Sequence, residues 1–168
     1  MLKINIKKYS IMKKIIIIGA GAMGSAFAVP CLENQNEVTL VGTHLEDDLI
    51  NKIKLNNNFH PALNIELPSK LKVEKFEKLQ SILEEGVDII VAGVSSVGIE
   101  WFVKQITKSY KKNLPIILLT KGLAIEDNEL ITLSDKIKKL LKDQGHTDIN
   151  ISAIKGPCLA AGLAYKMR

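Results

Sequence analysis

Arginine is almost absent from this chain of 168 residues, because its 23 basic residues are lysines except for Arg168. The lysines are spread along the sequence, and only 5% of the residues are aromatic. Nucleic-acid interfaces usually combine clustered basic side chains with arginine and aromatic rings. We therefore interpret the formal net charge of +5 as solvated lysines and expect no nucleic-acid partner.

Cysteines and long apolar runs are also scarce. Cys31 and Cys158 lie far apart without C-x-x-C spacing, which argues against a metal site or a disulfide framework. The apolar run after the basic start of the chain is too short for a signal peptide, and no segment reads as a membrane span. We expect a cytosolic protein. Residues 1–12 read as an N-terminal extension, with Met12 a candidate natural start, and residues 13–168 as one domain.

A glycine-rich turn follows the most apolar stretch of the chain. Isoleucine fills positions 15–18, which predicts a buried strand. Gly19, Gly21 and Gly24 follow with the spacing G-x-G-x-x-G. In a strand–turn–helix unit the first glycine makes the turn, the second lets a pyrophosphate approach the backbone, and the third lets the helix lie close to the strand. The alternative is a tightly packed turn without a ligand, because the motif alone is weakly specific.

Strand-like and helix-like segments alternate along the rest of the chain. This alternation predicts an α/β fold of the Rossmann type, a doubly wound, mainly parallel sheet with helices on both faces. The expected strands cover residues 15–18, 37–42, 71–74, 87–94, 115–120 and 149–154, and the expected helices cover 22–34, 45–55, 77–85, 99–110 and 127–144. Residues 56–68 are expected to form a loop because of their Asn and Pro content.

A proline inside the first expected helix and two acids at the start of the last one are interpreted as structural residues. Pro30 lies inside the first helix, where proline removes a backbone hydrogen bond, so we expect a kink or an early end there. Glu126 and Asp127 read as acids at the start of the last helix, where they would complement its dipole.

The carboxyl ends of the expected strands carry the residues of chemical interest, because ligands of doubly wound sheets bind at those ends. Lys121 follows an apolar strand and precedes a glycine, so its ammonium group is expected beside a nicotinamide, where a carbonyl or hydroxyl oxygen would lie. The alternative is a lysine that only reaches solvent. The residue groups at the strand ends are Gly19–Gly24, Gly42–His44, Val94–Ser96, Thr120–Gly122 and Lys155–Gly162.

The order and wording of these motifs resemble the N-terminal half of the soluble, bacterial-type glycerol-3-phosphate dehydrogenase family. That family shows G-A-G-x-x-G-x-A, N-x-x-F-L-P, V-P-S-H, T-K-G-L and S-G-P-[ST]-F-A-x-E in this order. The segments here are GAGAMGSA (19–26), NNNFHP (56–61), GVSS (93–96), TKGL (120–123) and KGPCLA (155–160). The resemblance covers nearly the whole chain from Lys14, and its specificity rests on TKGL and GP.

The resemblance implies an oxidoreductase that interconverts dihydroxyacetone phosphate and sn-glycerol 3-phosphate, a phospholipid precursor, by hydride transfer with NAD or NADP. It places the acid/base lysine and the phosphate-binding arginine in a following helical domain. We expect this chain to be a fragment or truncated product without that domain. Alone, the chain is expected to bind cofactor but to be inactive. The full-length protein is a candidate homodimer. The implied cofactor contacts are Gly19, Gly21, Ala22, Met23, Gly24, Thr43, Lys121 and Ala160, and the implied substrate contacts are Lys121, Gly156 and Cys158.

Several positions depart from the family pattern, which bears on the substrate more than on the fold. Cys158 reads as a small inert residue, because no nearby pattern supplies an activating base. His44, His60 and His146 read as solvated loop histidines without metal-ligand spacing. The departures are His60 for Leu, Val94 and Ser96 for Pro and His, Lys155 for Ser, Cys158 for Ser or Thr, and Gly162 for Glu.

Two other functions stay open. A ketopantoate-reductase-like enzyme would share the opening GAGAMGS and a lysine after a middle strand, although the GPCLAAG segment argues against it. A non-catalytic dinucleotide-binding module, such as a sensor or an assembly domain, is the second alternative.

The preference between NAD and NADP is inferred from the end of the second strand. NAD enzymes usually carry Asp or Glu there, whereas this chain reads Gly42, Thr43 and His44. Without a carboxylate to repel a 2′-phosphate, and with the Thr43 hydroxyl and Lys52 nearby in sequence, we expect NADP(H) to bind at least as well as NAD(H).

Overall fold

A six-stranded parallel sheet runs through the part of the chain that the computed structural model describes, residues 12–111, 113–156 and 158–167. The strand order is β10-β7-β6-β1-β2-β5, which is the 3-2-1-4-5-6 order of a Rossmann sheet when these strands are counted along the chain. The predicted fold class is therefore confirmed. The strands are β1 (Lys14–Ile18), β2 (Glu37–Val41), β5 (Lys72–Glu74), β6 (Ile89–Ala92), β7 (Ile116–Leu118) and β10 (Ile151–Ala153).

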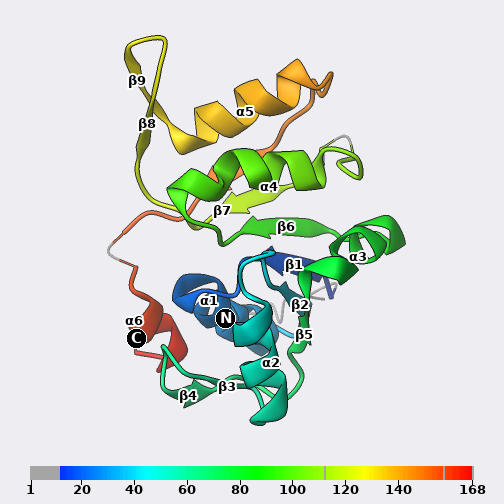
Figure 1. Cartoon of the computed structure of the whole chain (residues 1–168), viewed down its shortest axis with the longest axis vertical. Coiled ribbons are helices and arrows are strands. Elements are labelled where there is room, and N and C mark those ends of the chain that lie inside the picture. The colour runs from blue at the N-terminus through cyan, green and yellow to red at the C-terminus, as the bar shows by residue number, and fades with distance from the viewer. Residues whose placement is uncertain (1–11, 112, 157, 168) are drawn as a thin grey trace, which may run out of the picture.

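Helices cover both faces of this sheet (Figure 1). On β1, Ile16 and Ile18 belong to the apolar core shared with the first group of helices below, whereas Ile15 and Ile17 belong to the core shared with the second group. A strand buried on both faces needs apolar residues at every position, which explains the isoleucine run. The first group is α3 (Leu79–Glu85), α4 (Ile99–Ile106) and α5 (Leu133–Asp143), with the 3₁₀ helices η1 (Phe76–Lys78) and η2 (Ser96–Gly98) before α3 and α4; the second group is α1 (Ala22–Glu33), α2 (Asp47–Leu55) and α6 (Ala160–Ala164).

The segment 56–68 is more ordered than the loop expected from its composition. It contains an antiparallel hairpin of β3 (Phe59–His60) and β4 (Ile65–Glu66). Leu63 and Leu67 are buried in the core against α1 and α2, which holds the segment in place. Asn57, Asn58 and Asn64 adopt the positive φ angles that its tight turns require, so the asparagines here indicate defined turns and not a flexible loop.

The expected helix at 127–144 is wrong in its first part, because a second hairpin precedes α5. The hairpin consists of β8 (Leu123–Glu126) and β9 (Glu129–Thr132), joined by Asp127 and Asn128 with φ of 50° and 64°. Two adjacent residues with positive φ match the tight turns that hairpins favour. The helix begins only after Thr132, whose hydroxyl accepts a hydrogen bond from the Asp135 N–H at 3.1 Å.

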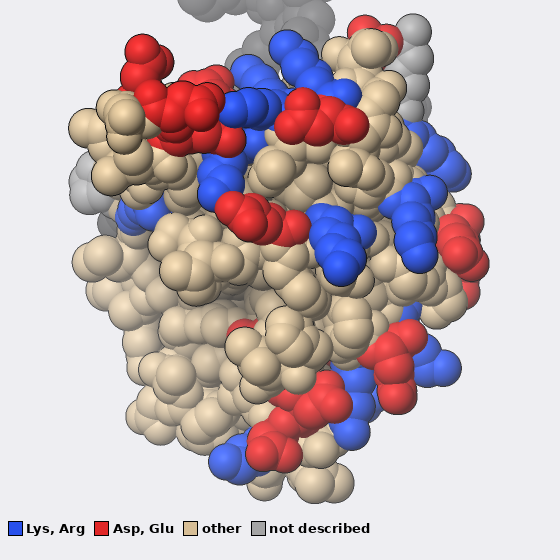
Figure 2. All heavy atoms as spheres, turned by 45° about the horizontal axis from the view of Figure 1, so that its top comes forward, with Lys and Arg blue, Asp and Glu red and all other residues tan. Residues whose placement is uncertain are grey.

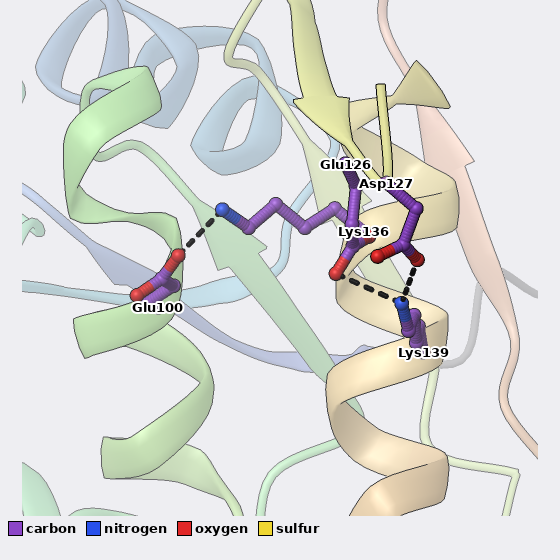
Figure 3. Close-up of polar contacts among 5 residues, drawn as sticks. All are labelled: Glu100, Glu126, Asp127, Lys136 and Lys139. Atoms are coloured by element: carbon purple, nitrogen blue, oxygen red, sulfur yellow. Dashed lines mark hydrogen bonds and ion pairs between the residues drawn. The ribbon is translucent and has the colours of Figure 1, made fainter. Parts of the chain in front are cut away.

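Glu126 and Asp127 are therefore not acids at a helix start. Both pair with Lys139 of α5, at 3.1 Å and 3.3 Å, and tie the tip of the hairpin to the helix (Figure 3). These carboxylates, that of Glu126 first, raise the pKa of the Lys139 ammonium above its usual value. Lys136 makes a similar ion pair from α5 to Glu100 of α4 (Figure 3).

Pro30 does not end α1 early, because the helix continues to Glu33. The Pro30 carbonyl oxygen still accepts a hydrogen bond from the Asn34 N–H at 3.2 Å. Proline removes only its own N–H bond to the Ala26 carbonyl oxygen, and the residues after it keep the helical conformation to Glu33.

Basic and acidic side chains are mixed over the face shown in Figure 2, with no continuous basic patch on that face. This distribution agrees with the interpretation of the lysines as solvated residues. Among the residues described, no helix has both the length and the apolarity that crossing a bilayer requires.

Candidate functional site

The three glycines of the turn between β1 and α1 are glycine for different reasons. Gly19 has a φ of +109°, and a Cβ there would lie 2.6 Å from the Gly93 carbonyl oxygen. A Cβ on Gly24 would overlap the Gly19 carbonyl oxygen. Gly21 has an ordinary φ of −61°, and the nearest heavy atom to a Cβ there would be Glu46 Oε1 at 3.8 Å. The fold needs the first and third glycines, whereas the second leaves open space that a ligand can occupy.

The N-terminus of α1 begins directly after this open position. The first helical hydrogen bond runs from the Ser25 N–H to the Gly21 carbonyl oxygen at 3.0 Å. The N–H groups of Ala22 and Met23 precede that bond and have no acceptor inside the helix. No acidic residue lies in the first turn of α1. Such a helix start attracts a phosphate group through free N–H donors and the positive end of the helix dipole.

Glu46, which the sequence analysis did not single out, closes one side of the turn. Its Oε2 atom accepts hydrogen bonds from the Thr43 N–H at 2.7 Å and from the Ala20 N–H at 3.0 Å. The carboxylate thus joins the end of β2 to the glycine turn. Gly42, Thr43 and His44 carry no carboxylate, as the sequence shows, but the structure brings the Glu46 carboxylate back to the same edge of the sheet. A search for an acid about 20 residues beyond the glycine motif, rather than directly after the strand, would have found it.

Thr43 and His44 lie on the same loop after β2. The Thr43 side-chain oxygen accepts a hydrogen bond from the Leu45 N–H at 3.4 Å. The exposed ring of His44 packs beside those of Trp101 and Phe76, with centroid distances of 5.1 Å and 6.1 Å. His44 is thus exposed, as expected, but it also covers an aromatic cluster.

Lys121 meets the loop after β10, as expected from the strand-end argument. Its Nζ donates a hydrogen bond to the Cys158 carbonyl oxygen at 2.7 Å. A Cβ on Gly156 would lie 3.5 Å from the same Nζ. The structure therefore brings Lys121, Gly156 and Cys158 together, while Pro157 lies outside the described residues. Ala160 begins α6, which packs against α1.

His60 is not a solvated loop histidine, because its side chain is completely buried. Its Nδ1 accepts from the Leu63 N–H at 3.3 Å, so Nε2 carries the proton that is donated to the Ala20 carbonyl oxygen at 3.0 Å. The ring therefore fixes the carbonyl oxygen of Ala20, the residue after the first glycine of the turn. His146 is half-buried and packs edge-on against Tyr110, so it is not a fully solvated residue either.

The remaining unusual positions have structural or surface roles. Val94 is buried, and its carbonyl oxygen accepts a hydrogen bond from the Thr120 hydroxyl. Ser96 and Lys155 are exposed, and a Cβ on Gly162 would meet open space.

Burial raises the pKa of the Cys31 thiol to about 11, so this cysteine stays protonated and unreactive at neutral pH. No group of three or more metal-binding side chains occurs in the described part of the chain.

Comparison with known proteins identifies the family. The sequence model of a protein family, described as the NAD-dependent glycerol-3-phosphate dehydrogenase N-terminus, matches residues 14–167. The chain belongs to this family. The NADP(+)-dependent glycerol-3-phosphate dehydrogenase of Archaeoglobus fulgidus is 34% identical over 155 residues, which are 91% of this chain and 44% of the relative. The glycerol-3-phosphate dehydrogenase [NAD(P)+] of Mesoplasma florum is 35% identical over 150 residues, which are 88% of this chain and 42% of the relative.

Solved structures of glycerol-3-phosphate dehydrogenases share the fold. The crystal structure of the enzyme from Coxiella burnetii superposes with a TM-score of 0.72 at 22% identity, covering 92% of this chain and 44% of that one. At this identity the likeness concerns the fold alone. The chain spans less than half the length of these glycerol-3-phosphate dehydrogenases.

Proposed function

We propose that this chain is the dinucleotide-binding part of an NAD(P)-dependent oxidoreductase that interconverts dihydroxyacetone phosphate and sn-glycerol 3-phosphate. The observation that carries the proposal is the open space at Gly21, which neither backbone strain nor packing explains. A pyrophosphate that fills this space would reach the N–H groups of Ala22 and Met23. Gly19, Gly24 and Thr43 shape the same turn, and Ala160 lies at the start of the neighbouring α6.

The reacting end of the site is placed at Lys121. When bound, the cofactor supplies or takes up the hydride, and the protein orients the reactants. The Lys121 ammonium beside Gly156 and Cys158 supplies a positive charge that can stabilise developing negative charge on a substrate oxygen. The acid/base lysine and phosphate-binding arginine that the resemblance implies belong to another domain. On this reading the described residues bind the cofactor, and turnover needs groups beyond those that they supply.

The wider biological role rests on the resemblance and on family membership. These support a role in supplying phospholipid precursors, a cytoplasmic location and a homodimer for a full-length protein. Arg168, the single arginine, lies outside the described residues.

The test is a calorimetric titration of the chain with NADH and NADPH, followed by an assay of cofactor oxidation with dihydroxyacetone phosphate. We expect binding of at least one dinucleotide and no measurable turnover, because loss of the proton-transfer group alone costs about 10²- to 10⁴-fold in rate. Failure to bind either dinucleotide would refute the proposal. Turnover by the purified chain would refute the assignment of essential groups to another domain, and turnover with ketopantoate instead would favour the ketopantoate-reductase alternative.

A further inference from the structure

His60 is a buried polar side chain at a position where the family pattern has leucine. Its ring is completely buried, and both ring nitrogens are hydrogen-bonded, Nδ1 to the Leu63 N–H at 3.3 Å and Nε2 to the Ala20 carbonyl oxygen at 3.0 Å. Burying a polar ring costs free energy unless each polar atom finds a partner. The ring meets this condition, and no buried side-chain nitrogen or oxygen of the described residues lacks a partner. His60 is thus a specific contact between the β3–β4 hairpin and the glycine turn.

The Ala20 carbonyl oxygen that the ring contacts belongs to the peptide unit between Ala20 and Gly21. The Ser25 hydroxyl donates to the same oxygen at 2.9 Å, so two side chains hold it inside the core. A trans peptide is planar, and its C=O and N–H groups point in opposite directions. The Gly21 N–H therefore points away from His60, toward the open side of the turn. Within the described part of the chain, this N–H has no hydrogen-bond acceptor.

The open side of the turn is where the proposed function places the pyrophosphate. The N–H groups of Ala22 and Met23 are free at the start of α1, and the Gly21 N–H directly precedes them. Successive backbone N–H groups form an anion-binding concavity, and they bind more tightly when their directions are fixed before the ligand arrives. Rotation of the Ala20–Gly21 peptide would remove one donor from this group.

We propose that His60 is a positioning residue for the dinucleotide. Its ring holds the Ala20–Gly21 peptide so that the Gly21 N–H joins those of Ala22 and Met23 on the pyrophosphate. The ring is buried and does not touch the ligand, so it acts only through the peptide. This inference rests on the proposed function.

The segment that follows α6 holds the ring in its place. Leu63, whose N–H donates to the ring, is buried, and its carbonyl oxygen accepts a hydrogen bond from the Tyr165 hydroxyl at 2.9 Å. Tyr165 comes directly after α6, which lies beside the β3–β4 hairpin (Figure 1). Tyr165 is thus connected to the glycine turn through Leu63 and His60, and loss of its hydroxyl group should loosen the ring.

Two substitutions of His60 each keep one of the two ring contacts. The side-chain nitrogen of glutamine is as many bonds from Cα as Nε2, so His60→Gln keeps the donor to Ala20. The side-chain oxygen of asparagine corresponds to Nδ1 in the same way, so His60→Asn keeps the acceptor for Leu63 but is too short to reach Ala20. Each variant loses one buried hydrogen bond, so thermal unfolding should show similar losses of stability.

Calorimetric titration with NADH distinguishes these two variants. We expect His60→Gln to bind NADH with a Kd within about twofold of the wild-type value, and His60→Asn to bind about fivefold more weakly, which corresponds to about one hydrogen bond. Equal Kd values for the two variants, or weaker binding by His60→Gln, would overturn the inference, because His60 would then only support the fold. If the wild-type chain binds neither NADH nor NADPH, the proposed function itself fails.

A pair of milder variants keeps the inference testable if the His60 variants do not fold. Tyr165→Phe removes the hydroxyl that contacts Leu63, and Tyr110→Phe removes one that donates to the Leu114 carbonyl oxygen at 3.0 Å. Tyr110 belongs to the apolar core on the other side of the sheet from Leu63, so it is the matched control. We expect Tyr165→Phe to raise the Kd of NADH about threefold and Tyr110→Phe to leave it unchanged. Equal Kd values in this pair would contradict the connection to the turn and overturn the inference.

Discussion

Alanine substitutions at Gly21 and Gly24 should separate ligand binding from folding in the glycine turn. At Gly21 the φ of −61° suits any residue, and a Cβ has 3.8 Å of clearance from Glu46. The reduced entropy of the unfolded chain stabilises Gly21→Ala by about 0.4–1 kcal/mol. Alanine is a poorer N-cap than glycine, and this offsets the gain by a similar amount. The free energy of unfolding should therefore change by less than about 1 kcal/mol.

The same substitution should weaken cofactor binding strongly. The added methyl group would occupy the space assigned to the pyrophosphate, and forcing an extra methyl group into a close-packed contact typically costs about 1–3 kcal/mol. At the middle of that range the Kd rises about 30-fold. Gly24→Ala is the matched variant: its Cβ would overlap the Gly19 carbonyl oxygen, so α1 must shift away from β1. We expect Gly24→Ala to lose about 3 kcal/mol or more of stability.

Calorimetry with NADH and thermal unfolding, both applied to each variant, check these expectations. For a domain of this size, a loss of 3 kcal/mol lowers the Tm by about 6–12 °C. A Gly21→Ala chain with undiminished cofactor affinity would refute the assignment of the open space to the pyrophosphate. A Gly24→Ala chain as stable as the wild type would show that the close approach of α1 to the turn is not required.

Two further predictions concern stability. His60→Leu should lower the free energy of unfolding by about 1–2 kcal/mol in urea titrations, because it removes two buried hydrogen bonds of the ring. The Ala20 carbonyl oxygen keeps only the Ser25 hydroxyl and the Leu63 N–H keeps only the His60 carbonyl oxygen. Unchanged stability would contradict a structural role for the ring. The Lys14 N–H, together with Lys13, lowers the pKa of the Asp88 carboxyl below its usual value of 3.8. The exposed carboxylate therefore stabilises the fold above pH 3.8, and this effect is lost as the pH falls through the lowered pKa. In urea titrations Asp88→Asn should lower the free energy of unfolding by about 0.5 kcal/mol at pH 7 and by progressively less below pH 4, and a difference that does not change with pH would contradict this linkage.

The inner strands β1, β6 and β7 of the central sheet are predictable because each is a short apolar run before a turn signal. The edge strand β5 (KVE) has one apolar residue between two charged ones and is the weakest of these signals. The isoleucines at 15–18 are apolar on both faces, and the structure buries both. The sequence argument overlooks the hairpin before α5 because it counts Ile131 with Ile137 and Leu141 as one apolar helix face. Six residues separate Ile131 from Ile137, so an ideal helix would put them about 120° apart. The local signals against a helix were present, namely Asp127 and Asn128 as a turn and the Thr132 N-cap.

The site was predictable only where chain-local patterns determine it. The glycine spacing and the lysine at the end of β7 identified the turn and the position of Lys121. His60 and Glu46 act on Ala20 from 40 and 26 residues away, and local composition does not encode such a contact. Sequence reasoning therefore gives His60 a loop role and does not single out Glu46, although together they fix Ala20, the residue after Gly19.

The two ends of the proposed site differ in how firmly this chain holds them. Ala20 is fixed through its carbonyl oxygen by a buried imidazole and through its N–H by Glu46, so the glycine turn is shaped before any ligand arrives. Lys121, at the reacting end, is exposed and donates to a single carbonyl oxygen of a short loop. Preorganised contacts reduce the entropy lost on binding, whereas an exposed lysine must still be ordered. We therefore expect the glycine turn to bind its ligand with little rearrangement, whereas Lys121 must be ordered by whatever binds beside it.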